Sequence, residues 1–273
     1  MNRMDAGFAE TVENPFGRAL QAGQPLIGVW SMLNSFNVTE GLSLAGYDWL
    51  LVDGEHAPVT LADAMMHLRI LAATRTVPIV RLPWNDPILL KQYLDAGART
   101  VMLPYVQSAD EAREAVQAMH YPPRGRRGVA AMHRASRFGF DPGYLGHASD
   151  TLFLIVQAET QAALDRVGEI AAVDGVDAVF FGPGDLAASM GKIGRAGDAD
   201  VTAAIDAAAT KVRAAGKAVG VMSANDELAE RHLRNGYDFV SVSNDAAMVF
   251  SAARNASQHY RSIAEQHKIR KSV

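Results

Sequence analysis

The feature that most constrains the fold of this chain is a regular alternation of short apolar runs with longer amphipathic stretches. Each apolar run has the length of a buried β-strand, and the stretch after it carries apolar side chains at helical spacing. The eight predicted strands are residues 25–30, 49–52, 77–80, 100–103, 152–156, 176–181, 218–222 and 239–242. Two of the predicted helices are residues 39–45, with Thr39 as N-cap, and residues 160–172. Because strands that alternate with helices form parallel sheets, the chain is predicted to be an α/β protein.

The number of strand–helix pairs favours a closed barrel. No change in composition marks a linker within the 273 residues, so we expect a single-domain (β/α)8 TIM barrel over residues 15–273. Residues 1–14 are polar and unpatterned, and they are predicted to form a flexible N-terminal arm. The alternative is a doubly wound open sheet. That fold usually carries a glycine-rich phosphate turn after its first strand, and residues 30–33 contain none.

One connection interrupts this rhythm. Residues 121–150 lie between a predicted helix at 108–120 and the fifth strand, and they are rich in proline, glycine and arginine. Connections of this length within a compact domain are usually functional or disordered. We interpret the segment as an ordered loop that contributes to an active site and an interface.

Composition excludes several classes of function. The net charge of −4 gives no electrostatic reason to expect nucleic-acid binding. No apolar run reaches membrane-spanning length and residues 1–13 lack the apolar middle of a signal peptide, so we expect a cytoplasmic protein without a membrane partner. The absence of cysteine excludes disulfides, thiolate metal ligands and a cysteine nucleophile.

Polar side chains gather where the predicted strands end. In a barrel of this type the active site lies at the C-terminal ends of the strands. The side chains expected there are Asp53, Glu55, His56, Arg81, Gln157, Glu159 and Asp185. Glu159 and Asp185 follow neighbouring strands, and together they can hold a hard divalent cation while leaving positions for water and substrate.

Each of these residues also has a purely structural interpretation. Acidic residues after strands often cap the next helix, as Asp185 can do for the helix that begins near it. A histidine after a strand is often only a hydrogen-bonded loop residue, and Arg81 can simply pair with a carboxylate. Gln157 can satisfy backbone groups at the strand end. The convergence of these residues, more than any one of them, favours a functional site.

The lysines narrow the chemistry further. A Schiff-base aldolase needs a lysine amine that faces the pocket. The six lysines of the chain are Lys91, Lys192, Lys211, Lys217, Lys268 and Lys271. None lies within a predicted strand or at its C-terminal end, so electron withdrawal from a carbonyl would depend on a metal ion.

Six ordered blocks carry a resemblance to a known family. They are Asp-Gly-Glu-His-Ala-Pro at 53–58, Val-Arg-Leu-Pro at 80–83, Leu-Asp-Ala-Gly-Ala at 94–98, Tyr-Pro-Pro-Arg-Gly-Arg-Arg-Gly-Val at 121–129, Gln-Ala-Glu-Thr at 157–160 and Gly-Pro-Gly-Asp-Leu at 182–186. Over about residues 15–265 the chain resembles the metal-dependent (class II) pyruvate or hydroxyketoacid aldolases of the 4-hydroxy-2-oxoheptanedioate aldolase family. The resemblance implies an enzyme that makes or cleaves the C3–C4 bond of 4-hydroxy-2-oxo acids, giving pyruvate or hydroxypyruvate plus an aldehyde.

The resemblance also implies roles for site residues. Glu159 and Asp185 would hold Mg²⁺, Mn²⁺ or Co²⁺, and Gln157 would position the keto group of the 2-oxo acid. Backbone N–H groups of Gly184 and Asp185 would hold its carboxylate. His56, oriented by Asp53, corresponds to the catalytic base of the family. Arg81 would stabilise the enolate oxygen, a developing negative charge.

Substrate choice and assembly are less constrained. Residues 137–142 depart from the pattern expected of members that act on diacid semialdehydes, and Val129 and Met222 fall at positions of the aldehyde pocket in the family. The physiological aldehyde therefore stays open. By resemblance the assembly is a homohexamer, a trimer of dimers that exchange their last helix. The apolar face of that helix (Ala246, Ala247, Phe250 and Ala253) is equally compatible with packing on its own barrel.

Two other functions are open at this point. A relative of the citrate-lyase type would keep the barrel and the metal but act on CoA thioesters. A catalytically inactive barrel would only bind a metabolite, although the joint presence of His56, Arg81, Glu159 and Asp185 argues against it.

Overall fold

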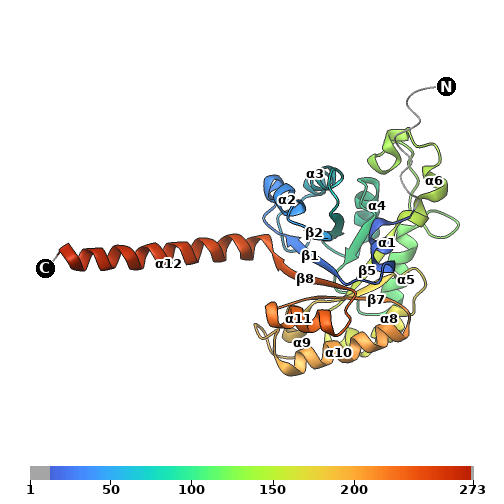
Figure 1. Ribbon diagram of the computed structural model, residues 1–273. Helices are drawn as coiled ribbons and strands as arrows, with labels where there is room; N and C mark the ends of the chain where they lie inside the picture. Colours follow the sequence, from blue (N-terminus) through green and yellow to red (C-terminus); the bar gives the residue numbers. More distant parts are fainter. Residues whose placement is uncertain (1–12, 272–273) are drawn as a thin grey trace.

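A closed barrel of eight parallel strands forms the centre of the molecule (Figure 1). The computed structural model describes residues 13–271, with side chains up to residue 267. The strands are β1 (Leu26–Ser31), β2 (Trp49–Asp53), β3 (Val77–Arg81), β4 (Thr100–Leu103), β5 (Phe153–Ala158), β6 (Ala178–Phe181), β7 (Ala218–Met222) and β8 (Phe239–Asn244). Each pairs in parallel with its neighbour along the chain, and β8 pairs with β1. The predicted (β/α)8 barrel is therefore confirmed.

The helices cover the outside of the barrel. They are α2 (Phe36–Ser43), α3 (Leu61–Leu71), α4 (Pro87–Asp95), α5 (Ala109–Met119), α7 (Gln161–Asp165), α8 (Val167–Ala171), α9 (Pro183–Ser189), α10 (Ala199–Ala214) and α11 (Asp226–Arg234). Two predicted boundaries were wrong. Thr39, the predicted N-cap of α2, lies inside that helix, which Ser35 caps instead. The single helix predicted at 160–172 is divided at Arg166 into α7 and α8.

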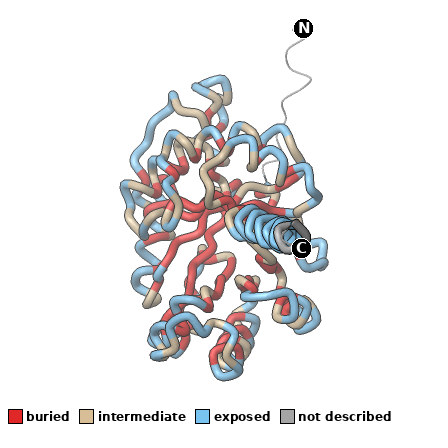
Figure 2. Tube along the Cα trace, turned by 90° about the vertical axis from the view of Figure 1, so that its left-hand side faces the viewer, coloured by how far each residue is buried: buried red, intermediate tan, exposed pale blue. Residues whose placement is uncertain are grey.

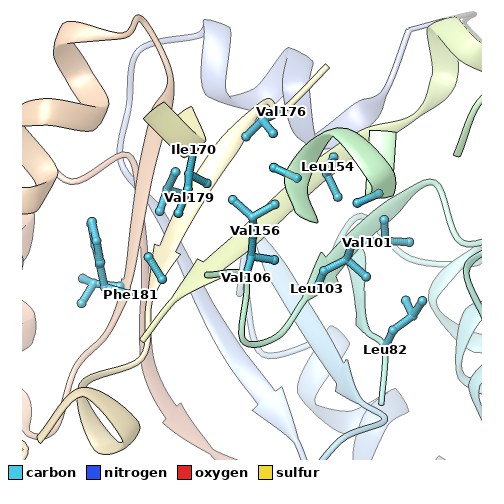
Figure 3. Close-up of a cluster of buried hydrophobic side chains, with 14 of the residues drawn as sticks. Leu82, Val101, Leu103, Val106, Leu154, Val156, Ile170, Val176, Val179 and Phe181 are labelled. Carbon is cyan, nitrogen blue, oxygen red and sulfur yellow. The ribbon is translucent and has the colours of Figure 1, made fainter. Parts of the chain in front are cut away.

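Two apolar clusters hold the barrel and its helices together. One fills the space between strands and helices, and Figure 3 shows part of it, including Val156, Val179 and Phe181. The other lies within the barrel and contains Trp49 and Phe239. Gly28 leaves space for the Trp49 ring, since a Cβ at residue 28 would lie 2.0 Å from that ring. Figure 2 shows the burial concentrated in the strands.

A short helix, α1 (Pro15–Gln21), closes the N-terminal end of the barrel and was not predicted. Its Phe16 is fully buried, with its ring edge-on to those of Phe153 and Phe239. Asn14 caps α1 and also donates a hydrogen bond to the Thr151 carbonyl oxygen (2.9 Å). Of the predicted N-terminal arm, residues 1–12 lie outside the described residues, whereas Asn14 is part of the barrel floor.

The long connection at 121–150 is ordered, as expected. It forms two 3₁₀ turns, Arg134–Gly139 and Ala148–Thr151, on either side of α6 (Tyr144–His147). The buried Arg127 guanidinium ties it to α4 through Asp95, with 2.6 Å between Nη2 and Oδ1.

The last helix, α12 (Asp245–Lys271), extends away from the barrel (Figures 1 and 2). Its first turn contacts β1 and β8, and the described side chains from Val249 to His267 are exposed. Phe250, on the predicted apolar face, is 57% exposed. Beyond its first turn, the described part of α12 therefore does not cover its own barrel. Within residues 13–271, no helix is long and apolar enough to cross a membrane.

Candidate active site

A buried ion pair lies at the C-terminal ends of β2 and β3. Asp53 and Arg81 are the last residues of these strands and are direct register partners. Arg81 donates from Nε to Asp53 Oδ1 (2.8 Å) and from Nη2 to Oδ2 (2.7 Å). Both side chains are almost completely buried. This bidentate geometry fixes the plane of the guanidinium group.

Three further side chains surround the same guanidinium. Arg81 Nη1 lies 2.7 Å from Glu55 Oε2 and donates to Gln157 Oε1 at 3.4 Å. The Trp30 ring lies against its face, 4.3 Å from the guanidinium carbon. Arg81 is thus held by residues from β1, β2, the loop after β2, and β5, and it cannot move away without breaking several contacts.

Glu159 lies next to this group, just after β5. Its side chain is buried, and Oε2 accepts a hydrogen bond from Gln157 Nε2 (3.2 Å). Oε1 accepts from the backbone N–H of Tyr105 (2.8 Å), a residue held in the left-handed region at φ 58°. Gly182, at the end of β6, leaves space for the carboxylate, because a Cβ there would lie 2.5 Å from Glu159 Oε2.

The electrostatics of this region favour a bound cation. The pKa of Glu159 is raised to about 7. Burial is the main cause and the negative charges of Glu55 and Asp185 add to it, whereas the Tyr105 N–H bond and Arg81 act in the opposite direction. Burial also raises the pKa of Glu55, while Arg81 lowers it. Four carboxylates therefore lie in the region of one guanidinium group, that of Arg81: Asp53, Glu55, Glu159 and Asp185. A divalent cation with oxygen ligands is the group that this donor set fits.

Asp185 and Gly184 lie in the first turn of α9 and are exposed. Asp185 is close enough to Glu159 to raise its pKa. A Cβ at Gly184 would meet no heavy atom within 4 Å. A small ligand can therefore approach the backbone at this point.

His56 occupies the loop after β2, and its side chain is 58% exposed. Its backbone N–H donates to Asp53 Oδ1 (3.3 Å), whereas its ring lies nearest Glu55, with 3.9 Å between Nε2 and Oε1. Asp53 was expected to orient His56. Its contact with His56 is through the backbone N–H, and its two carboxylate oxygens are also bound to Arg81.

The two predicted acceptor-pocket residues lie in different settings. Met222 ends β7 and packs against the apolar cluster inside the barrel. Val129 is 62% exposed on the long connection, next to Gly128, where a Cβ would lie 3.4 Å from Cδ of Lys91 in α4. The contacts described for residues 13–267 do not join Val129 to the group around Arg81.

Sequence reasoning gave no role to three residues of this site. Glu55 was placed at the strand ends without a function, although it contacts both Arg81 and His56. Trp30 is the next-to-last residue of β1, and its buried indole N–H has no hydrogen-bond partner in the described structure. Tyr105 follows β4. The signal available for Trp30 and Tyr105 was an aromatic residue at a C-terminal strand end.

The structure also bears on the metal and lysine predictions. Within residues 13–267, no three His, Asp or Glu side chains are grouped as a ready metal site. A site at Glu159 and Asp185 would therefore need water or substrate oxygens as further ligands. Lys217 lies at the N-terminal end of β7, where it donates to the Val176 carbonyl oxygen, and no described strand contains a lysine.

Known proteins with this arrangement were found by sequence and by structure. The HpcH/HpaI aldolase/citrate lyase family matches residues 26–252. A 4-hydroxy-2-oxo-heptane-1,7-dioate aldolase from Escherichia coli is 47% identical over 89% of this chain and 93% of its own. A hydroxypyruvate/pyruvate aldolase from Roseovarius nubinhibens is 46% identical over 91% of this chain and 97% of its own.

The structural comparison agrees with these matches. The crystal structure of an HpcH/HpaI aldolase/citrate lyase family protein from Burkholderia cenocepacia superposes with a TM-score of 0.87 at 40% identity, covering 91% of this chain and 99% of the other. The chain therefore belongs to the HpcH/HpaI aldolase/citrate lyase family, and it is a carbon–carbon lyase of the aldolase type.

Proposed function

We propose that this aldolase depends on a divalent metal ion and makes or cleaves the C3–C4 bond of 4-hydroxy-2-oxo acids, giving pyruvate or hydroxypyruvate plus an aldehyde. The observation that carries the proposal is the buried Glu159 carboxylate, whose pKa is raised to about 7 beside the acids Glu55 and Asp185. A cation at this point would compensate their charge. The names of the similar aldolases from E. coli and R. nubinhibens support the substrate class.

Glu159 and Asp185 are the residues that would hold the metal. Mg²⁺, Mn²⁺ and Co²⁺ all suit a site of carboxylate oxygens completed by water and a 2-oxo acid. When bound, such an ion withdraws electrons from the keto group of the donor. Gln157 is fixed between Arg81 and Glu159, and from there it would orient that keto group.

The donor carboxylate would lie at the start of α9. The backbone N–H groups of Gly184 and Asp185 are in the first helical turn, where they have no partner within the helix. Glycine at 184 leaves the approach open. The acceptor aldehyde would lie toward Met222 at the end of β7, with Val129 as a second wall of its pocket.

His56 and Arg81 would perform the proton transfer and the charge stabilisation. In cleavage, His56 takes the proton of the C4 hydroxyl, and the C3–C4 bond breaks to an aldehyde and an enolate. The protonated His56 then returns this proton to C3 of the enolate, which completes the 2-oxo acid. Arg81 stabilises the enolate oxygen, and its fixed position means that little reorganisation is needed during the reaction.

The assembly we propose is a homohexamer, a trimer of dimers in which the last helix is exchanged. The support is the exposed face of α12, on which Phe250 is 57% exposed. A helix of this kind gains stability from packing against another surface.

A donor-by-aldehyde activity panel, run with and without metal, tests the function. We expect turnover of 4-hydroxy-2-oxo acids to be lost after EDTA treatment and restored by Mn²⁺, Mg²⁺ or Co²⁺. Lactate-dehydrogenase-coupled release of pyruvate provides the measurement. Full activity after exhaustive chelation, or a requirement for CoA, would contradict the proposal.

A further inference from the structure

The loop that carries His56 is fastened at both of its ends. At one end, Asp53 Oδ1 accepts hydrogen bonds from the backbone N–H groups of Glu55 (3.0 Å) and His56 (3.3 Å). At the other end, the Pro58 carbonyl oxygen accepts from Nδ2 of Asn34 (2.9 Å). Asn34 belongs to the loop between β1 and α2, so a separate βα unit sets the position of residues 56–58.

The Asn34 amide is oriented by His67 of α3. The two side chains meet at 3.0 Å between Asn34 Oδ1 and His67 Nε2. An amide oxygen can only accept, so Nε2 carries the proton and Oδ1 faces the ring, which directs Nδ2 to Pro58. His67 is completely buried, and burial lowers its pKa, so the ring is neutral near pH 7. Its Nδ1 then accepts from the hydroxyl of Thr39 (2.9 Å).

The backbone that carries Asn34 is also held in place. Asp245, the buried first residue of α12, accepts from the N–H groups of Met32 (2.7 Å) and Leu33 (3.1 Å). Asn34 itself has φ 48°, in the left-handed region that asparagine tolerates better than most residues. The side chain therefore projects from a rigid support.

We propose that Asn34 and His67 are positioning residues for His56, acting through the Pro58 carbonyl oxygen. This proposal rests on the proposed function, in which His56 is the base. The His56 ring is mostly exposed, and its nearest described charged partner, Glu55, is 3.9 Å away. The position of the loop backbone consequently decides where the imidazole lies. A displacement of about 1 Å in such a group can cost up to about 10²-fold in rate.

Asn34→Gly provides the main test, because glycine accepts a positive φ. The change removes the side chain with its hydrogen bonds to Pro58, His67 and Asp63. We expect kcat for cleavage of a 4-hydroxy-2-oxo acid to fall roughly 10-fold. The KM for this substrate should change less than about twofold, since the groups proposed to bind it lie on other loops. Asn37→Gly is the matched control: Asn37 is exposed on α2, and this variant should retain wild-type kcat.

The same substitution in a His56→Ala enzyme distinguishes a positioning role of Asn34 from a general loss of structure. If Asn34 acts through His56, Asn34→Gly should change the residual rate of a His56→Ala enzyme less than about twofold, because interacting sites are non-additive. An equal loss in both backgrounds, or no loss in either, would overturn the positioning role. An inactive wild type, or a fully active His56→Ala enzyme, would instead refute the proposed function.

Variants of His67 test the second half of the proposal. His67→Gln keeps an N–H donor in reach of Asn34 Oδ1, whereas His67→Leu removes it. We expect the glutamine variant to recover most of the kcat that the leucine variant loses, with both assayed below their melting temperatures. Equal activities of the two variants would show that the contact to Asn34 does not position His56, and Asn34→Gly decides the question for Asn34 if His67→Leu does not fold.

Discussion

The two ends of the barrel carry the same kind of side chain in opposite roles. At the N-terminal end, three aspartates, which we call the floor acids, each precede a strand: Asp48, Asp177 and Asp238. Each accepts a hydrogen bond from a backbone N–H of the neighbouring strand: Ile27 (2.8 Å), Leu154 (2.7 Å) and Val219 (2.7 Å), respectively. These carboxylates complete the hydrogen bonding of the sheet where it begins.

The acids at the C-terminal end, which we call the mouth acids, are Asp53, Glu55, Glu159 and Asp185. Asp53 and Glu55 contact Arg81, and Glu159 is buried with a raised pKa. Their mutual repulsion and burial cost stability in the absence of a cation. Burial raises the pKa of the floor acid Asp177 as well, although the Leu154 N–H bond and Lys217 act in the opposite direction. The floor acids nevertheless complete the hydrogen bonding of the sheet, whereas the mouth acids keep a charge imbalance that a ligand can relieve.

The difference is visible in the sequence once the structure is known. Each floor acid lies two residues after a glycine in the connection between a helix and the next strand: Gly46, Gly175 and Gly236. These glycines have φ values of 95°, 92° and 72°, the left-handed conformation that ends many helices. A pattern of glycine, any residue and aspartate before a strand thus marks a structural acid in this chain, whereas the mouth acids follow their strands.

The largest expected effect comes from removing the charge of a mouth acid. Glu159→Gln keeps the shape of the side chain but removes the negative charge proposed to hold the metal. We expect kcat/KM to fall about 10³-fold, which corresponds to about 4 kcal/mol of transition-state stabilisation. The melting temperature of the metal-free protein should not fall, since the change also removes a buried charge.

Glu169→Gln is the matched control for this prediction. Glu169 is exposed on α8, so the same change there should leave both activity and stability unaltered. Retention of most activity by Glu159→Gln would place the essential cation elsewhere and remove the functional contrast between the two ends.

A second prediction uses the pKa of Glu159. Its value in the folded metal-free protein is raised from 4.5 to about 7, so between these pH values the folded state binds a proton that the unfolded state does not. The free energy of unfolding should therefore rise as the pH falls from 7.5 to 5.5, by about 1–2 kcal/mol from this residue. The measurement is denaturant unfolding of the wild type and of Glu159→Gln at both pH values. The difference between the pH dependences of the two proteins is the contribution of Glu159.

A bound metal ion should reverse this pH dependence of the free energy of unfolding. Because a metal ligand must be deprotonated, excess Mn²⁺ should stabilise the wild type more at pH 7.5 than at pH 5.5. A wild type and a Glu159→Gln variant with the same pH dependence would mean that Glu159 is ionised normally in the folded protein.

Sequence alone predicted the barrel because strand and helix periodicity is local. The same local reasoning placed Asp53, Arg81, Gln157 and Glu159 at one end of the sheet, since parallel strands share a C-terminal rim. It failed where tertiary contacts decide a helix boundary. Thr39 was predicted to cap α2, but its hydroxyl is bonded to His67 inside the molecule, and Ser35 caps the helix.

The pairing of side chains within the site could not be predicted either. Several acids at one rim are within reach of Arg81 and His56, and the choice among them depends on side-chain rotamers that the sequence pattern does not specify. The structure pairs Asp53 with Arg81 and leaves the His56 ring nearest Glu55. Asn34 lies 24 residues before Pro58, whose carbonyl oxygen it binds. Polar residues this far apart in the chain produce no periodic pattern that could reveal their contact.

The smallest expected effect on activity comes from a floor acid. Asp238→Ala leaves the N–H of Val219, a completely buried residue of β7, without its acceptor. The free energy of unfolding should fall by about 1–3 kcal/mol, the cost of an unsatisfied buried donor, while kcat should stay within about twofold of the wild type. Asp238→Asn keeps an acceptor oxygen and should lose less stability than the alanine variant. If Asp238→Ala instead lowered kcat without changing the unfolding curve, the floor of this barrel would contribute to catalysis, and the division of roles between its two ends would have to be abandoned.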